Sequence, residues 1–125
     1  MLYSILIYDS EAVVASWTKQ EDDELVANHV AVQQGLAAEG KLGPVVRLMP
    51  TTAAVTLKPG AEPLVMDGPY AETKEALLGF YVLECATLEE VIEAARLLPN
   101  KSGAAVFEIR PICWFHPVDG LKELK

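Results

Sequence analysis

The sequence predicts an α+β fold, a ferredoxin-like split βαβ sandwich in which two helices cover one face of a mainly antiparallel sheet. Three observations support this prediction: strand-like runs near both ends and in the middle of the chain, two capping boxes that each begin a helical pattern, and turn signals between these segments. The 125 residues fall within the usual size of one domain, so we expect a single domain over residues 1–125.

The first strand is predicted from the N-terminal residues. Residues 3–8 (YSILIY) are rich in the β-branched and aromatic types that suit a pleated sheet. Asp9 and Ser10 mark the end of this run. A short connection to the first helix should follow.

The first helix is predicted to start at a capping box. Thr18 and Glu21 have the spacing at which each side chain reaches a free backbone N–H of the first turn. Apolar residues then recur at helical spacing, at Leu25, Val32 and Leu36, until Gly40 ends the pattern. His29 lies on this apolar stripe and should therefore point toward the sheet.

The middle of the chain is predicted to form a β-hairpin. Residues 45–49 and 53–57 both read as extended, and the intervening Pro-Thr-Thr favours a turn. A short extra strand follows at residues 64–66, and the turn residues Asp67, Gly68 and Pro69 stop it.

The last three elements repeat the pattern of strand, helix and strand. Residues 78–85 (LGFYVLEC) read as a long strand, and Thr87 with Glu90 forms a second capping box. The second helix ends before Pro99, and residues 104–112 form the last strand, in which Pro111 marks a strand end or a sheet edge.

The strand patterns predict that both faces of the sheet are apolar, whereas two helices can cover only one face. We expect the second face to pack against the equivalent sheet of another copy, giving a two-fold homodimer. The alternative is cover by the chain's own C-terminal tail, residues 113–125, which contains Trp114 and Phe115.

Composition and charge exclude several classes of function. Eighteen acidic and ten basic residues give a formal charge of -8, which opposes binding to the phosphate backbone of nucleic acid. The N-terminus lacks the basic region of a signal peptide, and no run approaches the roughly 20 apolar residues of a membrane span. We therefore expect a cytoplasmic protein that binds neither nucleic acid nor membrane.

The sequence also predicts no metal and no cofactor. The two histidines, His29 and His116, lack the spacing and acidic neighbours of a zinc site. No glycine-rich phosphate-binding motif is present. Cys85 and Cys113 have no CxxC spacing, and we expect both to be reduced, buried thiols.

Residues 67–84 (DGPYAETKEALLGFYVLE) closely resemble the signature of the YCII-related proteins, specifically the DGPF-domain group, with Tyr70 in place of the usual Phe. The resemblance extends from residue 1 to residue 112 and includes LIY near the start, a first helix that carries His29, the TLEEVIEAARLLP helix and EIRPI near the end. It implies a ferredoxin-like fold that dimerises through its sheets into an α+β barrel.

The resemblance also implies a His and Asp pair in a cleft, because such a pair is the reason that YCII-like proteins are suspected of enzymatic activity. Related barrels include isomerases, lyases and monooxygenases, and DGPF members occur beside or fused to extracytoplasmic-function sigma factors. In YCII proteins the Asp lies soon after the first helix, but residues 41–58 of this chain contain no carboxylate. Asp67 or Glu72 would have to supply the acid.

His29 and Asp67 are thus the candidate catalytic residues. His29 would be the general base, since its ordinary pKa lies near neutrality, and Asp67 would orient the imidazole. The alternative is structural: His29 would be a hydrogen-bonded core residue and Asp67 a turn former.

Four further residues are candidates for substrate binding. Glu72 and Lys74 could form a polar rim in which Lys74 binds an anionic group, although a solvated loop explains them equally. Arg110 could bind a carboxylate of a substrate or pair with a neighbouring Glu, and Tyr81 could add a hydroxyl to the cleft or simply pack.

Three functions remain open from the sequence. The first is a small homodimeric enzyme in which His29 moves a proton on a small cyclic or anionic metabolite. The second is a non-catalytic ligand-binding module that accompanies a regulator. The third is a structural dimer in which residues 67–81 only connect two strands.

Overall fold

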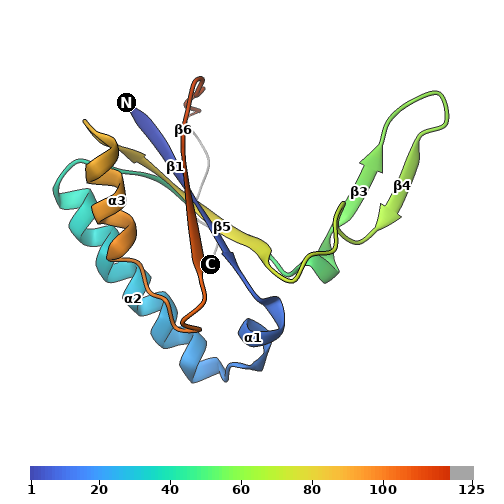
Figure 1. The fold of residues 1–125 in the computed structure, drawn as a ribbon, viewed down its shortest axis with the longest axis horizontal. Coiled ribbons are helices and arrows are strands. Elements are labelled where there is room, and N and C mark those ends of the chain that lie inside the picture. The colour runs from blue at the N-terminus through green and yellow to red at the C-terminus, as the bar shows by residue number, and fades with distance from the viewer. Residues whose placement is uncertain (119–125) are drawn as a thin grey trace.

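The computed structural model describes residues 1–118 and has the predicted ferredoxin-like α+β fold. Four antiparallel strands form the main sheet, in the order β2 (Leu42–Arg47), β5 (Ala76–Glu84), β1 (Leu2–Asp9) and β6 (Val106–Pro111). Helices α2 (Lys19–Ala38) and α3 (Leu88–Arg96) lie on one side of this sheet (Figure 1). Pro111 ends the edge strand β6, as predicted.

The core lies between this sheet and the two helices. Ile5 of β1 and Leu83 of β5 point toward Val91 of α3, and these three side chains are at most 1 % exposed. Leu36 of α2 completes the contact from the second helix. The alternation of side chains along β1 and β5 thus places one apolar set under the helices, which is the main contribution to stability.

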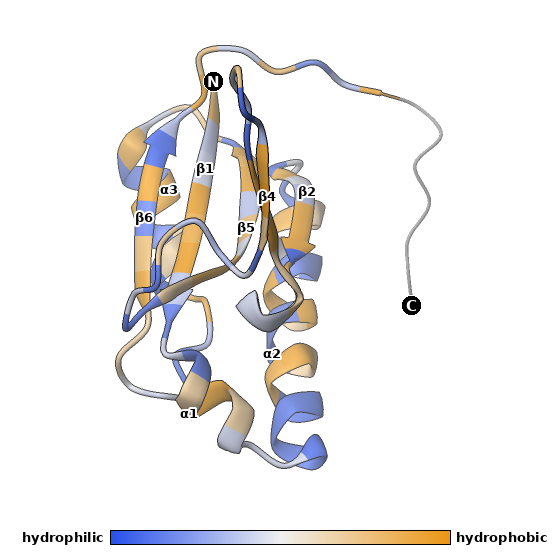
Figure 2. Ribbon diagram, turned by 90° about the vertical axis from the view of Figure 1, so that its right-hand side faces the viewer, coloured by the Kyte–Doolittle hydropathy of each residue, from blue (hydrophilic) through white to orange (hydrophobic). Residues whose placement is uncertain are grey.

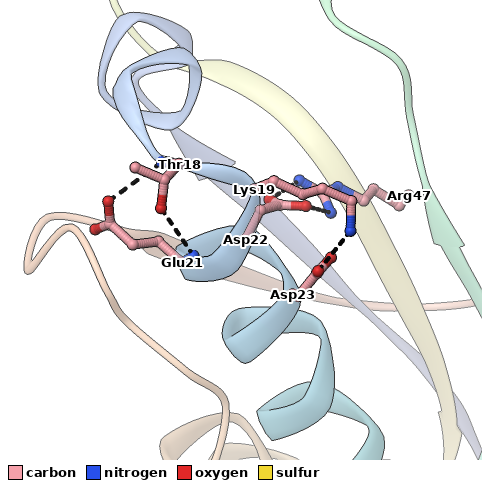
Figure 3. Close-up of polar contacts among 6 residues, drawn as sticks. All are labelled: Thr18, Lys19, Glu21, Asp22, Asp23 and Arg47. Carbon is pink, nitrogen blue, oxygen red and sulfur yellow. Dashed lines mark hydrogen bonds and ion pairs between the residues drawn. The ribbon is translucent and has the colours of Figure 1, made fainter.

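Both predicted capping boxes begin helices. The Thr18 hydroxyl accepts a hydrogen bond from the Glu21 N–H at 3.1 Å, and the Glu21 carboxylate accepts one from the Thr18 N–H at 3.2 Å (Figure 3). Thr87 accepts from the Glu90 N–H at 3.3 Å, whereas the Glu90 carboxylate accepts from the N–H of Ala86. The reciprocal bond of a capping box is thus absent at Thr87, and Glu90 satisfies the backbone donor of the preceding residue instead.

The predicted hairpin between residues 45–49 and 53–57 is wrong. β2 ends at Arg47 and pairs with β5, while the hairpin joins β3 (Val55–Lys58) to β4 (Leu64–Asp67) in a separate two-stranded sheet. The cause is a 3-10 turn at Thr51–Ala53, η1, which turns the chain away from the main sheet. Apolar runs identify strands, but they do not specify which strands pair.

The short helix α1 (Glu11–Ser16) is an element that the sequence patterns did not predict. Ser10 caps it by accepting a hydrogen bond from the Val13 N–H at 3.3 Å. Its Glu11 carboxylate accepts hydrogen bonds from both the N–H and the hydroxyl of Thr51. These contacts join α1 to η1 and so fix the end of the sheet where β1 and β2 finish.

The face of the sheet opposite the helices, called the open face below, carries the predicted apolar side chains of β1, β2 and β5. They include Leu6 and Val46, which both lie opposite Phe80 on neighbouring strands, together with Tyr8 and Val82. The same face also carries the polar residues Ser4, Glu108 and Arg110. The β3–β4 hairpin projects away from this face (Figures 1 and 2). On one side of the hairpin Val55, Leu57 and Val65 are each more than 60 % exposed.

The C-terminal tail departs in part from its prediction. Trp114 is 78 % exposed, so its side chain does not cover the open face, and residues 119–125 of the predicted tail lie outside the described residues. Cys113 is exposed, which corrects the expectation of a core thiol, because it follows the end of the edge strand β6; Cys85 is buried as expected. Over residues 1–118, none of the helices combines the length and apolar character needed to cross a membrane.

Candidate functional site

A cavity of about 180 Å³ lies between the first half of α2 and the end of the main sheet. We call it the His29 cavity. Its apolar wall comes from α1, α2, β2, β5 and the segment between α1 and α2, and includes Val14, Trp17, Leu25, Val26, Val45 and Leu78. Its polar side chains are Asp9, His29, Gln33, Arg47, Tyr81 and Lys101. An apolar cavity with a few polar groups is the usual form of a small-molecule site.

A hydrogen bond between α2 and β5 lies at the centre of these polar side chains. His29 Nδ1 lies 2.7 Å from Tyr81 Oη, and Gln33 Nε2 donates to the same oxygen at 3.1 Å. His29 and Gln33 are one helical turn apart on α2, so both reach the same point of the sheet. Tyr81 is 2 % exposed, and these two bonds satisfy its buried hydroxyl.

The Tyr81 hydroxyl can serve as donor or acceptor toward His29. When Tyr81 donates to Nδ1, the neutral imidazole carries its proton on Nε2. When Nδ1 carries the proton, it donates to Oη, and Nε2 keeps its lone pair. The same heavy-atom positions therefore hold the ring in either tautomer.

Burial favours the uncharged form of both rings. It lowers the pKa of His29 below the ordinary value of 6.5, and the positive charge of Arg47 lowers this pKa further. Burial also raises the pKa of Tyr81, an effect that the hydrogen bond from Gln33 opposes. His29 and Tyr81 therefore meet as neutral groups, a different arrangement from the His and carboxylate pair that the sequence suggested.

Asp9 is a second polar side chain in the wall, and it is only 5 % exposed. One of its carboxylate oxygens accepts a hydrogen bond from the Ser10 N–H at 2.7 Å. The other accepts from the Ser102 hydroxyl at 2.6 Å. Both oxygens of this buried side chain thus have a hydrogen-bond donor.

The two cations of the wall both have acidic partners. Arg47 donates to the two oxygens of Asp22 at 2.7 and 3.1 Å, a bidentate pair that joins β2 to α2 (Figure 3). This hydrogen bond lowers the pKa of Asp22 and raises that of Arg47. Lys101 lies 3.4 Å from the carboxylate of Glu21 and over the ring of Trp17.

The structure brings together two of the predicted site residues, His29 and Tyr81. Asp67 ends β4 in the projecting hairpin, exposed and paired with Val55 in the two-stranded sheet, and it does not line the His29 cavity. The ring nitrogen of His29 instead bonds to Tyr81. His29 and Asp67 therefore do not pair within this single chain, and their joint catalytic role stays a prediction.

The remaining predicted residues lie outside the cavity wall. Glu72 and Lys74 are exposed in the segment between β4 and β5. Arg110 is exposed on β6, opposite Ser4, whose hydroxyl donates to the Arg110 carbonyl at 3.0 Å. The rim of Glu72 and Lys74 and the substrate contact of Arg110 therefore stay predictions, and none of the three residues lines the His29 cavity.

Sequence reasoning missed Asp9 and Gln33 as cavity residues. Asp9 has the same parity along β1 as the buried Ile5, so the alternation of the strand was a usable signal for its burial. Gln33 follows His29 by one helical turn, which was a usable signal for its position. The partner Ser102 is 93 residues away from Asp9 in the chain, and no local pattern indicates that contact.

Within residues 1–118, no three acidic, histidine or cysteine side chains gather closely enough to hold a metal ion. The buried polar side-chain atoms of this part of the chain all have hydrogen-bond partners.

Comparison with known proteins gives two findings. The family model for the YCII-related domain matches residues 1–116. An uncharacterised protein of Rhizobium meliloti (strain 1021) is 49 % identical over 119 residues, which cover 94 % of this chain and 96 % of that protein. The match to the family model includes every element that lines the His29 cavity.

Proposed function

This chain belongs to the YCII-related family, and we propose that it is a small enzyme in which His29 moves a proton on a small metabolite held in the His29 cavity. The observation that carries the proposal is the 2.7 Å hydrogen bond between His29 and Tyr81 at the wall of an apolar cavity. The DGPF-like residues 67–84 further support placing the chain in that group of the family.

The chemistry follows from the tautomer that leaves Nε2 unprotonated. In this form Nδ1 donates to Tyr81 Oη, and the lone pair of Nε2 is available to the ligand. Because burial lowers the pKa of His29, the imidazole is uncharged at neutral pH and can accept a second proton on Nε2. After Nε2 takes a proton from the ligand, the bond from Nδ1 to Tyr81 is unchanged and the ring keeps its orientation.

A reaction of this kind needs no cofactor. A proton removed from one atom of the ligand and returned to another gives an isomerisation, in which His29 ends in its starting state. Tyr81, whose hydroxyl proton is then not used by Nδ1, can donate it to an oxygen or nitrogen of the ligand. Asp67 lies outside the cavity of its own chain, so its predicted role in catalysis is left to experiment.

Ligand binding without turnover is the second candidate. Two observations support it. The apolar wall can bind a ligand by removing apolar surface from water. The neutral His29 can also hydrogen-bond to a ligand without transferring a proton. A binding module fits the regulatory association that the DGPF resemblance implies.

We also propose that the protein is a homodimer joined through the open face. The apolar residues Leu6, Val46 and Phe80 support this, because moving their side chains out of water into an interface lowers the free energy. Light scattering at micromolar concentration should give the mass of two chains, and Phe80→Asp should give the mass of one. A cytoplasmic location is the simplest setting for such a protein and stays a prediction.

The experiment for the proposed function is a thermal-shift screen of small metabolites, followed by turnover assays of each compound that binds. His29→Ala should lose the shift and the turnover. His116→Ala is the matched control, because His116 is exposed and stacks on Trp114 rather than lining the cavity. Turnover that survives in His29→Ala would refute the proposed role of His29, and saturable binding without product would favour the binding module.

A further inference from the structure

The charges around the His29 cavity do not cancel. Arg47 is held by Asp22 at 2.7 Å, and Lys101 is held by Glu21 at 3.4 Å. Each cation of the wall thus has its own anion beside it. His29 adds no charge, because burial and the neighbouring Arg47 both favour its neutral form.

Asp9 is the exception. Its carboxylate is 5 % exposed and accepts two hydrogen bonds from Ser10 and Ser102, which are both neutral donors. Among residues 1–118, no lysine, arginine or histidine forms an ion pair with it. The cavity wall therefore carries a negative charge that has hydrogen bonds but no counter-charge.

A buried carboxylate of this kind discriminates between ligands by charge. It attracts a cation or a strong donor in a site that contains little water, and it repels a second carboxylate. The oxygens of Asp9 each accept one hydrogen bond, and a carboxylate oxygen can accept another. A ligand N–H group can thus be added without displacing Ser10 or Ser102.

The size of the cavity limits the rest of the ligand. Its volume is about 180 Å³, and an engineered apolar cavity of about 150 Å³ holds one benzene molecule. A single six-membered ring with a short side group is therefore the size that fits. The apolar residues Val14, Leu25 and Leu78 provide the surface against which such a ring would pack.

We propose that the His29 cavity selects small apolar amines of about one ring and uses the Asp9 carboxylate to bind their ammonium group. This differs from the anionic metabolite that Lys74 suggested in the sequence. The proposal rests on the proposed function only for the choice of cavity, and it names the class of ligand that would meet His29. Asp9 is then a residue that determines specificity through its charge.

The test is calorimetric binding of three matched probes at neutral pH: benzylamine, benzyl alcohol and benzoate. Benzylamine should bind at least about tenfold more tightly than benzyl alcohol, because a charge-assisted hydrogen bond is roughly twice as strong as a neutral one. Benzoate should bind most weakly of the three. Changes in the amide NMR signals of Gln33 and Gly79 should place benzylamine in the cavity.

Asp9→Asn keeps the shape of the side chain and removes its charge, so the preference for benzylamine over benzyl alcohol should disappear. Glu62→Gln is the matched control, since it removes one negative charge from an exposed residue between β3 and β4 and should leave the preference unchanged. If Asp9→Asn does not fold, the order of the three probes on the wild-type chain still decides the question.

Equal or tighter binding of benzoate would overturn the proposal, and so would the absence of saturable benzylamine binding at millimolar concentration. Loss of the preference in Glu62→Gln would also overturn it, because a general field would then explain the selectivity. Failure of the proposed catalysis looks different: amines would bind in a manner that depends on Asp9, but no compound that binds would be converted.

Discussion

The hydrogen bond between His29 and Tyr81 can be tested by replacing Tyr81 with Phe, which removes one oxygen and keeps the packing of the ring. The lost hydroxyl has two partners, His29 Nδ1 at 2.7 Å and Gln33 Nε2 at 3.1 Å. A net hydrogen bond contributes about 0.5 to 1.5 kcal/mol, and both partners are half-buried and can recover bonds to water. We therefore expect the free energy of unfolding to fall by about 1.5 kcal/mol.

A double-mutant cycle with His29→Leu separates the two bonds. In the His29→Leu background, Tyr81→Phe removes only the bond to Gln33. Its cost in unfolding free energy should therefore be smaller than in the wild-type background by about 0.5 to 1 kcal/mol. Urea unfolding followed by the fluorescence of Trp17, which lines the cavity, measures all four chains at one protein concentration.

The control for this cycle is Tyr3→Phe. Tyr3 also belongs to the core, at 7 % exposure, and within residues 1–118 its hydroxyl has no protein hydrogen-bond partner. Because the fully buried polar side-chain atoms of these residues are all paired, this oxygen must reach solvent, so the substitution should cost little. If the effects of Tyr81→Phe and His29→Leu add to within about 0.3 kcal/mol, the two side chains do not interact in solution and the reasoning is refuted.

Three further predictions concern the residues that hold the site. The pKa of folded His29 lies below 6.5, so the unfolded chain takes up a proton first as the pH falls. Between pH 7 and 5 the wild type should therefore lose more unfolding free energy than His29→Gln, and equal losses would contradict the lowered pKa. Thr18→Ala should cost about 1 kcal/mol in urea unfolding, since it removes the N-cap of α2, and no change would show that this cap is not formed. Gly79→Ala should cost about 2 kcal/mol or more, because the added Cβ would lie 2.2 Å from the Val46 carbonyl oxygen. Gly35→Ala meets open space and should instead stabilise α2. Similar effects at both glycines would refute the close approach of β2 to β5.

Much of the fold was predictable because it depends on local patterns. The alternation in β1 and β5, the stripe of α2 and the capping boxes at Thr18 and Thr87 are properties of neighbouring residues, and each led to an element in the right place. The hairpin was mispredicted because pairing is not local. Val45 and Val55 both read as strand residues, but one pairs with β5 and the other with β4.

The candidate site was predictable only in part, for the same reason. His29 was found because its position on the α2 stripe points it toward the sheet. Asp9 was read only as the end of a strand. The alternation of β1 indicated its burial, but its partner Ser102 lies 93 positions later, where no local pattern indicates the contact. Asp67 was chosen as the acid from the DGPY motif, but its strand belongs to the projecting hairpin. Contacts between distant segments decide which polar residues share a cavity.

The central claim is that His29 is a neutral, hydrogen-bonded imidazole available to exchange a proton with a ligand. The most direct test is the side-chain ¹⁵N NMR spectrum of both histidines as a function of pH, with His116→Asn used to assign the signals. The account predicts that His29 is neutral at pH 7, that its pKa lies below the ordinary 6.5, and that its nitrogen shifts change in Tyr81→Phe. A charged His29 at pH 7, or nitrogen shifts that are the same without the Tyr81 hydroxyl, would contradict it.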